Sequence, residues 1–241
     1  MPDPTARRRR AVGLMIAVPI VLAVAFWGLT YTPLFAARHI RVDGNHVLSD
    51  RHLRSVAGVS TSTNVAHLNE SDVVARLEAD PWVADASVRT DLPNTLVVSV
   101  DERRPVGVIA AMGETSVLAS DGQTLPSEGV RVAELPVVRA ALGEPTQDQR
   151  DAAATLLAAL DPVVFARVDE ALVGQDSMVT LALSSGAGVN AGQPGQEREK
   201  GDALRAVLRW AATENVDLMS IDISSPAAPS VKLSDGSTAG L

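Results

Sequence analysis

The 241-residue sequence contains no cysteine, only seven aromatic residues and only four histidines. Without cysteine the chain cannot build a disulfide framework, a thiolate-ligated zinc or iron–sulfur site, or a thiol nucleophile. The histidines all precede residue 68 and are scattered, so we expect surface histidines rather than a zinc or hydrolase site. They are His39, His46, His52 and His67. The pattern predicts a protein that is not an enzyme and needs no metal or other cofactor.

The charges are divided unevenly along the chain, whose formal net charge is −8. Arg7, Arg8, Arg9 and Arg10 stand against the single acid Asp3 in the first ten residues, which therefore carry +3. The remaining 231 residues hold 17 basic and 28 acidic side chains and so carry −11. An acidic body argues against nucleic-acid binding, because that function needs a basic surface.

A single membrane-spanning helix is predicted over residues 11–32. No charged residue occurs from Ala11 to Ala37, and the 21 residues 11–31 reach about 30 Å as a helix, the thickness of a bilayer core. Trp27 and Tyr31 stand at its far end, where aromatic rings settle among the headgroups.

The arginines fix the expected orientation of this helix. Because Arg7–Arg10 directly precede it, the positive-inside rule predicts a cytoplasmic tail over residues 1–10 and an extracytoplasmic location for everything after about residue 33. The alternative is a cleaved signal peptide with Ala23-Val24-Ala25 as its cleavage site. The run stays apolar through Leu29, which favours an uncleaved anchor.

A first exported module is predicted over residues 35–104, in the order β-α-α-β-β. Alternating polar and apolar residues indicate the strands, and Ser49 and Asn69 are N-cap residues for the two helices. Such a chain forms a three-stranded sheet on two helices, and we expect strands one and three to leave an open edge. The strands are expected at 38–43, 82–89 and 96–100, and the first helix at 49–57.

A second exported module is predicted over residues 105–233, mostly of antiparallel strands with two flanking helices at 147–160 and 197–213. Asp121-Gly122 is a strong hairpin signal. The glycine-rich run 186–192 lacks the Lys-Ser/Thr of a phosphate-binding loop, so we expect a hairpin turn followed by a loop. The strands are expected at 106–111, 117–120, 135–138, 165–173, 179–183, 219–223 and 230–233. Residues 234–241 are expected to form a flexible C-terminal tail. The predicted fold class of the chain is α+β.

Two runs of residues carry a resemblance to a known family. The first is Ile40-x-Val42-x-Gly44-Asn45, and the second extends from Pro81-Trp82-Val83 to Glu102-Arg103-x-Pro105-Val106. Together they resemble a POTRA domain and, more narrowly, the FtsQ/DivIB family of bacterial cell division proteins. The resemblance implies a POTRA domain followed by a β-domain, with Glu102 and Arg103 fixing the joint between them.

The same resemblance implies a function and a binding surface. A protein of this family is a bitopic scaffold of the divisome, located at the septum in the cytoplasmic membrane, that binds FtsB-like and FtsL-like partners and helps control septal peptidoglycan synthesis. It implies an exposed sheet edge to which a partner adds a strand, as in β-augmentation. The candidate edge residues are Ile221, Asp222, Ile223, Ser230, Val231, Lys232 and Leu233.

Two other functions remain open at this point. One is a POTRA-containing factor for outer-membrane assembly or translocation, which would need repeated POTRA units or a barrel of alternating strands of about ten residues. The other is an anchored extracytoplasmic enzyme, against which the missing catalytic constellation argues.

Overall fold

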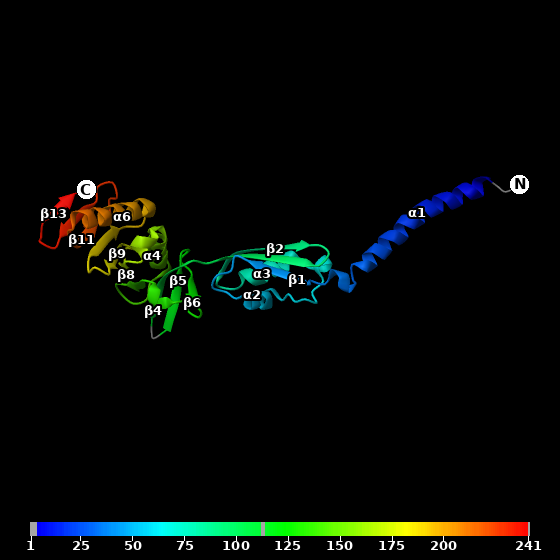
Figure 1. Ribbon diagram of the computed structural model, residues 1–241, viewed down its shortest axis with the longest axis horizontal. Helices are drawn as coiled ribbons and strands as arrows, with labels where there is room; N and C mark the ends of the chain where they lie inside the picture. The colour runs from blue at the N-terminus through cyan, green and yellow to red at the C-terminus, as the bar shows by residue number, and fades with distance from the viewer. Residues whose placement is uncertain (1–3, 112–113, 241) are drawn as a thin grey trace. The chain divides into compact units, whose positions relative to one another are not determined.

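A computed structural model describes residues 4–111 and 114–240, which form two compact units, Met1–Glu102 and Arg103–Leu241 (Figure 1). The division falls two residues before the predicted boundary after Arg104. We describe each unit by itself.

The chain begins with helix α1, Pro4–Leu29, which runs unbroken through Pro19. Its described apolar side chains, Met15 and Trp27 among them, are exposed. Within residues 4–111 and 114–240, no helix meets the length and hydropathy that crossing a membrane requires. The predicted span over residues 11–32 stays a prediction, and so does the tail over 1–10, because residues 1–3 and the side chains of Arg7–Arg10 lie outside the described residues.

The rest of the first unit is a three-stranded sheet with two helices, as the β-α-α-β-β prediction requires. The strand order is β1-β3-β2, with β1 parallel and β2 antiparallel to β3. The expectation that strands one and three leave an open edge is confirmed for strand one and wrong for strand three, because β3 is the central strand and β1 and β2 are the edges. The elements are β1 His39–Asp43, α2 Asp50–Ala57, α3 Glu70–Glu78, β2 Val83–Asp91 and β3 Thr95–Glu102.

Local sequence signals define both helices of this unit. The Ser49 hydroxyl accepts a hydrogen bond from the His52 backbone N–H, and Asn69 caps α3 in the same way through Ser71. Gly58, at φ +66°, ends α2 in the left-handed conformation that glycine adopts at low cost. The apolar stripes of the helices share one core with the buried residues of β2 and β3. The largest buried members of this core are Leu53, Val73, Leu77, Leu96 and Val83.

The second unit contains one ten-stranded sheet in the order β13-β12-β11-β10-β9-β8-β7-β4-β5-β6. Six of its neighbouring pairs are antiparallel, and β4–β7, β7–β8 and β10–β11 are parallel. The prediction of a mostly antiparallel β-domain with flanking helices is thus confirmed. The strands are β4 Pro105–Ala111, β5 Glu114–Ala119, β6 Thr124–Pro126, β7 Val137–Ala140, β8 Val168–Val173, β9 Val179–Leu183, β10 Gly188–Gly192, β11 Leu218–Asp222, β12 Ser230–Leu233 and β13 Thr238–Gly240.

Three helices accompany this sheet: α4 Gln147–Ala159, the four-residue α5 Pro162–Phe165, and α6 Glu197–Glu214. The expected strand 165–173 begins only at Val168, because Asp161 and Pro162 start α5 first. The hairpin predicted within 186–192 is present, but the residues expected as a loop form β10. Lys200 of α6 is 3% exposed, and its ammonium donates to the backbone carbonyl of Gln193.

The helices α4 and α6 pack against each other, and α4 also contacts β4, β5 and β8. Strand β9 has one buried face, since Val179, Leu181 and Leu183 are buried while Thr180 and Ala182 are exposed. The helices α4 and α6 approach each other closely at Gly201. A Cβ added at Gly201 would come within 2.8 Å of the Ala159 carbonyl oxygen. The opposite face of these strands is left polar and uncovered by any described helix.

Candidate partner-binding site

The last three strands form an antiparallel meander at one end of the sheet. In β11 and β12, Ile221 lies opposite Val231, and in β12 and β13, Val231 lies opposite Ala239. The expectation that Ser230–Leu233 is an edge strand is therefore wrong, because β12 pairs on both sides. Residues 234–241 are likewise not a flexible tail as a whole, since Thr238–Gly240 is the outermost strand.

A tight turn folds β13 back onto β12. The Asp235 carboxylate accepts hydrogen bonds from the Ser237 hydroxyl at 2.6 Å and the Ser237 backbone N–H at 2.8 Å, which lowers the Asp235 pKa. Gly236 takes φ +89°, and the Leu233 N–H donates to the Ser237 carbonyl at 2.9 Å. Asp235-Gly236 is the same hairpin signal as Asp121-Gly122, so the sequence did carry the sign of β13.

The turn also decides which backbone groups of β13 face outward. In an antiparallel ladder, pairs of residues joined by backbone hydrogen bonds recur at every second residue. Because Leu233 and Ser237 form such a pair, Val231 and Ala239 form the next one. Thr238 and Gly240 then direct their backbone N–H and C=O groups away from β12. The edge at the other end of the sheet, β6, finishes in Pro126, which has no N–H to offer.

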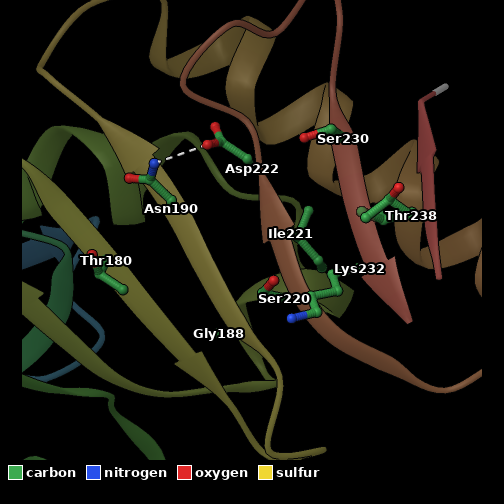
Figure 2. A pocket seen from close by; sticks show the side chains of 10 residues that line it. Thr180, Gly188, Asn190, Ser220, Ile221, Asp222, Ser230, Lys232 and Thr238 are labelled. Atoms are coloured by element: carbon green, nitrogen blue, oxygen red, sulfur yellow. Dashed lines mark hydrogen bonds between the residues drawn. The ribbon is translucent and has the colours of Figure 1, made fainter. Parts of the chain in front are cut away.

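An open polar face lies beside this edge, as Figure 2 shows. It encloses a shallow hollow of about 420 Å³ over strands β9 to β13. Alternate residues of these strands turn their side chains to the hollow, while their neighbours in sequence pack against the helices. The polar residues lining it are Thr180, Asn190, Ser220, Asp222, Ser230, Lys232 and Thr238.

The Asp222 carboxylate of this face is held by three hydrogen bonds. It accepts hydrogen bonds from the Ser224 hydroxyl at 2.6 Å, the Ser224 N–H at 2.9 Å and the Asn190 side-chain amide at 3.0 Å. The Ser224 hydroxyl does most to lower the Asp222 pKa, and the partial burial of the carboxylate opposes it. The face therefore presents a fixed negative charge at Asp222, and Lys232 of the neighbouring strand lies two positions along the ladder, opposite Ser220.

The structure separates the seven predicted edge residues into two groups. Ile221, Ile223 and Val231 are at most 2% exposed and belong to the core, so their side chains are not available to a partner. Leu233 is half-buried and packs against the same core. Asp222, Ser230 and Lys232 line the open face.

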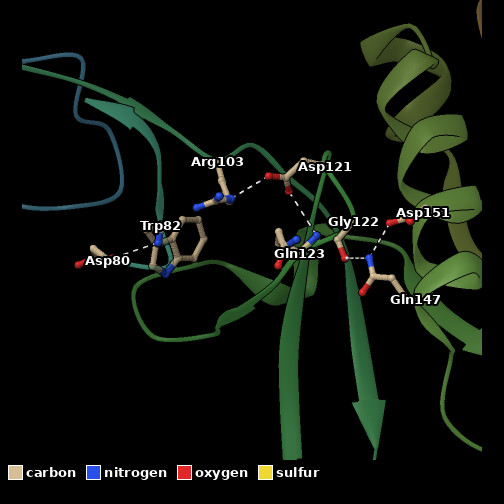
Figure 3. A network of polar contacts seen from close by, with 8 residues as sticks. All are labelled: Asp80, Trp82, Arg103, Asp121, Gly122, Gln123, Gln147 and Asp151. Atoms are coloured by element: carbon tan, nitrogen blue, oxygen red, sulfur yellow. Dashed lines mark hydrogen bonds and ion pairs between the residues drawn. The ribbon is translucent and has the colours of Figure 1, made fainter. Parts of the chain in front are cut away.

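The two residues expected at the joint between the modules each have a partner within their own unit. Glu102 accepts hydrogen bonds from three consecutive backbone N–H groups, those of residues 46–48, at 2.7 to 2.9 Å. Arg103 pairs with Asp121 at 2.8 Å, at the hairpin that lies beside α4 (Figure 3). The joint role of Glu102 and Arg103 stays a prediction.

The histidines have separate surroundings. His52 contacts the Asp80 carboxylate at 2.6 Å, and His67 stacks on Tyr31 with ring centroids 4.1 Å apart. His39 and His46 are exposed. Across residues 4–111 and 114–240, no three His, Asp or Glu side chains come together as ligands for a metal ion.

Comparisons with known proteins give consistent relatives. Residues 35–103 match the family model described as "POTRA domain, FtsQ-type". The chain is 30% identical over 237 residues to cell division protein FtsQ of Mycolicibacterium smegmatis, which covers 95% of the chain and 69% of that protein. It is 29% identical over 128 residues to cell division protein DivIB of Geobacillus kaustophilus, covering 53% of the chain and 48% of the relative. The solved major extracytoplasmic domain of DivIB from Geobacillus stearothermophilus matches with a TM-score of 0.36 and 23% identity, covering 46% of the chain and 93% of that domain.

Proposed function

The chain belongs to the FtsQ family of bacterial cell division proteins, and from that premise we propose that it holds its divisome partners by accepting a strand at β13. The observation that carries the proposal is the position of Thr238–Gly240 at the end of the sheet, with alternate backbone groups directed outward. Backbone hydrogen bonds would supply the affinity, and the polar face beside the edge would supply the selectivity.

The partners proposed for this edge are FtsB-like and FtsL-like division proteins, as the family resemblance implies. A strand added to β13 would extend the sheet, with Lys232 on the second strand from it, β12, and Asp222 on the third, β11. A long acidic side chain of the incoming strand would reach across β13 toward Lys232, and this attraction would favour one register. The protein would act as a scaffold in controlling septal peptidoglycan synthesis and not as a catalyst.

We further propose that α1 anchors the chain in the cytoplasmic membrane at the septum, with the two folded units outside. The support is the run without charge from Ala11 to Ala37, the arginines that precede it, and the exposed apolar side chains of α1. Cysteine substitutions at Thr5 and Ser225, probed with a membrane-impermeant thiol reagent in spheroplasts, test the orientation. Labelling of T5C without S225C would overturn it.

The edge is tested by Thr238→Pro, with Thr238→Val as its matched control. Proline removes the outward N–H of this residue, whereas valine keeps the backbone donor and favours a strand. We expect T238P to lose co-purification of the FtsB-like partner and T238V to retain it. Equal capture by both variants would overturn strand addition at β13.

A chain ending at Ser237 distinguishes β13 from β12 as the acceptor. If β13 accepts the partner strand, this truncation loses binding, because its outward donors are gone. Retained or tighter binding would mean that β13 covers the true acceptor, β12, and is displaced. Val231→Pro is a poor substitute, because Val231 is buried in an inner strand and the change would disrupt the sheet itself.

The cellular role is tested in the bacterium that carries this chain. Depletion should give filamentous or unseparated cells, and a tagged copy should gather at midcell. Normal septation after depletion, with the tag spread evenly over the membrane, would overturn the role in division.

A further inference from the structure

A small apolar hollow lies between α5 and α6, on elements that take no part in the β13 edge. It has a volume of about 200 Å³. On one side stand residues of α5 and its flanks, among them Val163, which is 65% exposed, and the buried Val164. On the other side α6 contributes Leu208 and Ala212. A valine exposed to this extent beside a recess is an apolar surface that no described part of the chain covers.

Three arginines surround this apolar floor. Arg205 and Arg209 come from α6, where they stand with Leu208 and Ala212 at helical spacing i, i+3, i+4 and i+7, and Arg167 comes from the segment after α5. This cluster of basic residues contrasts with the negative net charge of the unit, because residues 103–241 hold eleven basic and eighteen acidic side chains. Asp161 is the one acidic residue of the lining, so the hollow keeps a net positive charge on an acidic unit.

The three arginines differ in whether their guanidinium groups already form ion pairs within the chain. Arg205 pairs with Asp161 at 3.5 Å and with Asp202 at 3.0 Å. Among residues 4–111 and 114–240, neither Arg167 nor Arg209 forms an ion pair, and both are exposed. Two guanidinium groups with free donors thus flank the apolar floor, and a guanidinium is suited to bind a carboxylate through two parallel hydrogen bonds.

The size of the hollow limits what it can hold. Pockets for small-molecule ligands occupy about 300–1,000 Å³, and this one is smaller and open to solvent. The hollow can hold one apolar side chain of a bound segment, while the neighbouring residues of that segment stay at the edge of the hollow, near the arginines. We propose that the α5–α6 hollow binds an acidic segment of a partner protein, with one apolar side chain on Val163 and Leu208 and carboxylates on Arg167 and Arg209. This site is independent of strand addition at β13.

A defined peptide tests the proposal with the full purified chain. The probe is a fluorescein-labelled, terminally blocked peptide of sequence Glu-Leu-Glu-Glu-Leu-Glu, and its binding is followed by fluorescence anisotropy. The double variant Arg167→Glu/Arg209→Glu should weaken binding by at least about tenfold, equivalent to about 1.4 kcal/mol. The matched control is Arg198→Glu, on α6 but outside the hollow, which should bind as the parent chain does.

Two further probes separate the recess from a general electrostatic surface. The same peptide with alanine for leucine should bind at least about tenfold more weakly, since the apolar side chain would no longer fill the floor. Val163→Asp should reduce binding of the leucine peptide at unchanged thermal stability, because Val163 is exposed and its loss leaves the core intact.

Three outcomes would overturn the proposal. The first is equal binding of the leucine and alanine peptides, which would leave only charge attraction. The second is equal loss of binding in R198E and in the double variant. The third is binding to vesicles containing phosphatidylglycerol that depends on Arg167 and Arg209 while the peptide does not bind, which would make the site a lipid contact. The variant T238P separates the two proposals: it should lose strand addition at β13 and still bind the acidic peptide at the α5–α6 hollow.

Discussion

The side-chain amide of Asn190 donates to the Asp222 carboxylate at 3.0 Å, across the parallel pair of strands β10 and β11. The same Asn190 side chain accepts from the Gly192 N–H at 3.1 Å, so its orientation is fixed from both ends. This bond ties the helix-covered hairpin β9–β10 to the C-terminal meander on the face left open. A partner on that face would therefore meet a rigid acidic group rather than a mobile side chain.

Asp222→Asn should lower stability at neutral pH by about 1 kcal/mol, because the amide cannot accept all three hydrogen bonds. The Asp222 pKa is lowered in the folded state, so its stabilisation is present above the unfolded pKa, about 3.9, and is lost as pH falls through the folded value. The stability difference between parent and variant should thus narrow below about pH 4. Urea denaturation at several pH values measures it, with Asp217→Asn as control, and a difference that widened on acidification would contradict the prediction.

Glu102→Gln should loosen the loop over residues 46–48 in the first unit. The carboxylate serves three backbone N–H groups, and a single amide oxygen leaves at least one without its bond, at a cost of about 1–3 kcal/mol. Hydrogen exchange of the loop amides should accelerate. Glu78→Gln, at an exposed position of α3, should leave them protected, and equal rates in both variants would sink the assignment.

Gly122→Ala should destabilise the second unit more than Gly186→Ala does. Both glycines have positive φ, +79° and +87°, so both substitutions carry the left-handed strain of about 1–2 kcal/mol. At Gly122 an added Cβ would also lie 1.9 Å from the Asp151 carboxylate of α4, whereas Gly186 has open space (Figure 3). Thermal unfolding compares the two, and equal losses would show that Asp151 moves aside freely.

Gly201→Ala should lower stability although alanine is the better helix former. In an exposed helix the change would gain about 0.5–1 kcal/mol. Here the new Cβ would come within 2.8 Å of the Ala159 carbonyl oxygen, so α4 and α6 must move apart. The control is Ala206→Gly at an exposed position of α6, which should cost about 1 kcal/mol through helix propensity alone. Stabilisation by G201A in denaturant titrations would exclude close packing at this position.

Much of the fold followed from local signals. Ser49, Gly58 and Asn69 act within one turn of their own helices, and the alternation of β9 or the stripe of α6 records which face is buried, so these elements could be predicted residue by residue. The family resemblance rests on the same kind of signal, since the Trp82 to Val106 run combines strand periodicity with fixed turn residues.

The order of strands within each sheet was decided only by the tertiary structure. Nothing near Thr95–Glu102 in sequence says that this strand has neighbours on both sides, because β1 reaches it from over fifty residues away. Likewise, Ser230–Leu233 has the same alternation whether it ends the sheet or lies inside it. Its place depends on whether three small residues after Asp235-Gly236 fold back to pair with it. Sequence thus determined most of the strands, but not β6, β10 or β13, and which of their faces are apolar, whereas long-range backbone pairing determined which strand is left open to a partner.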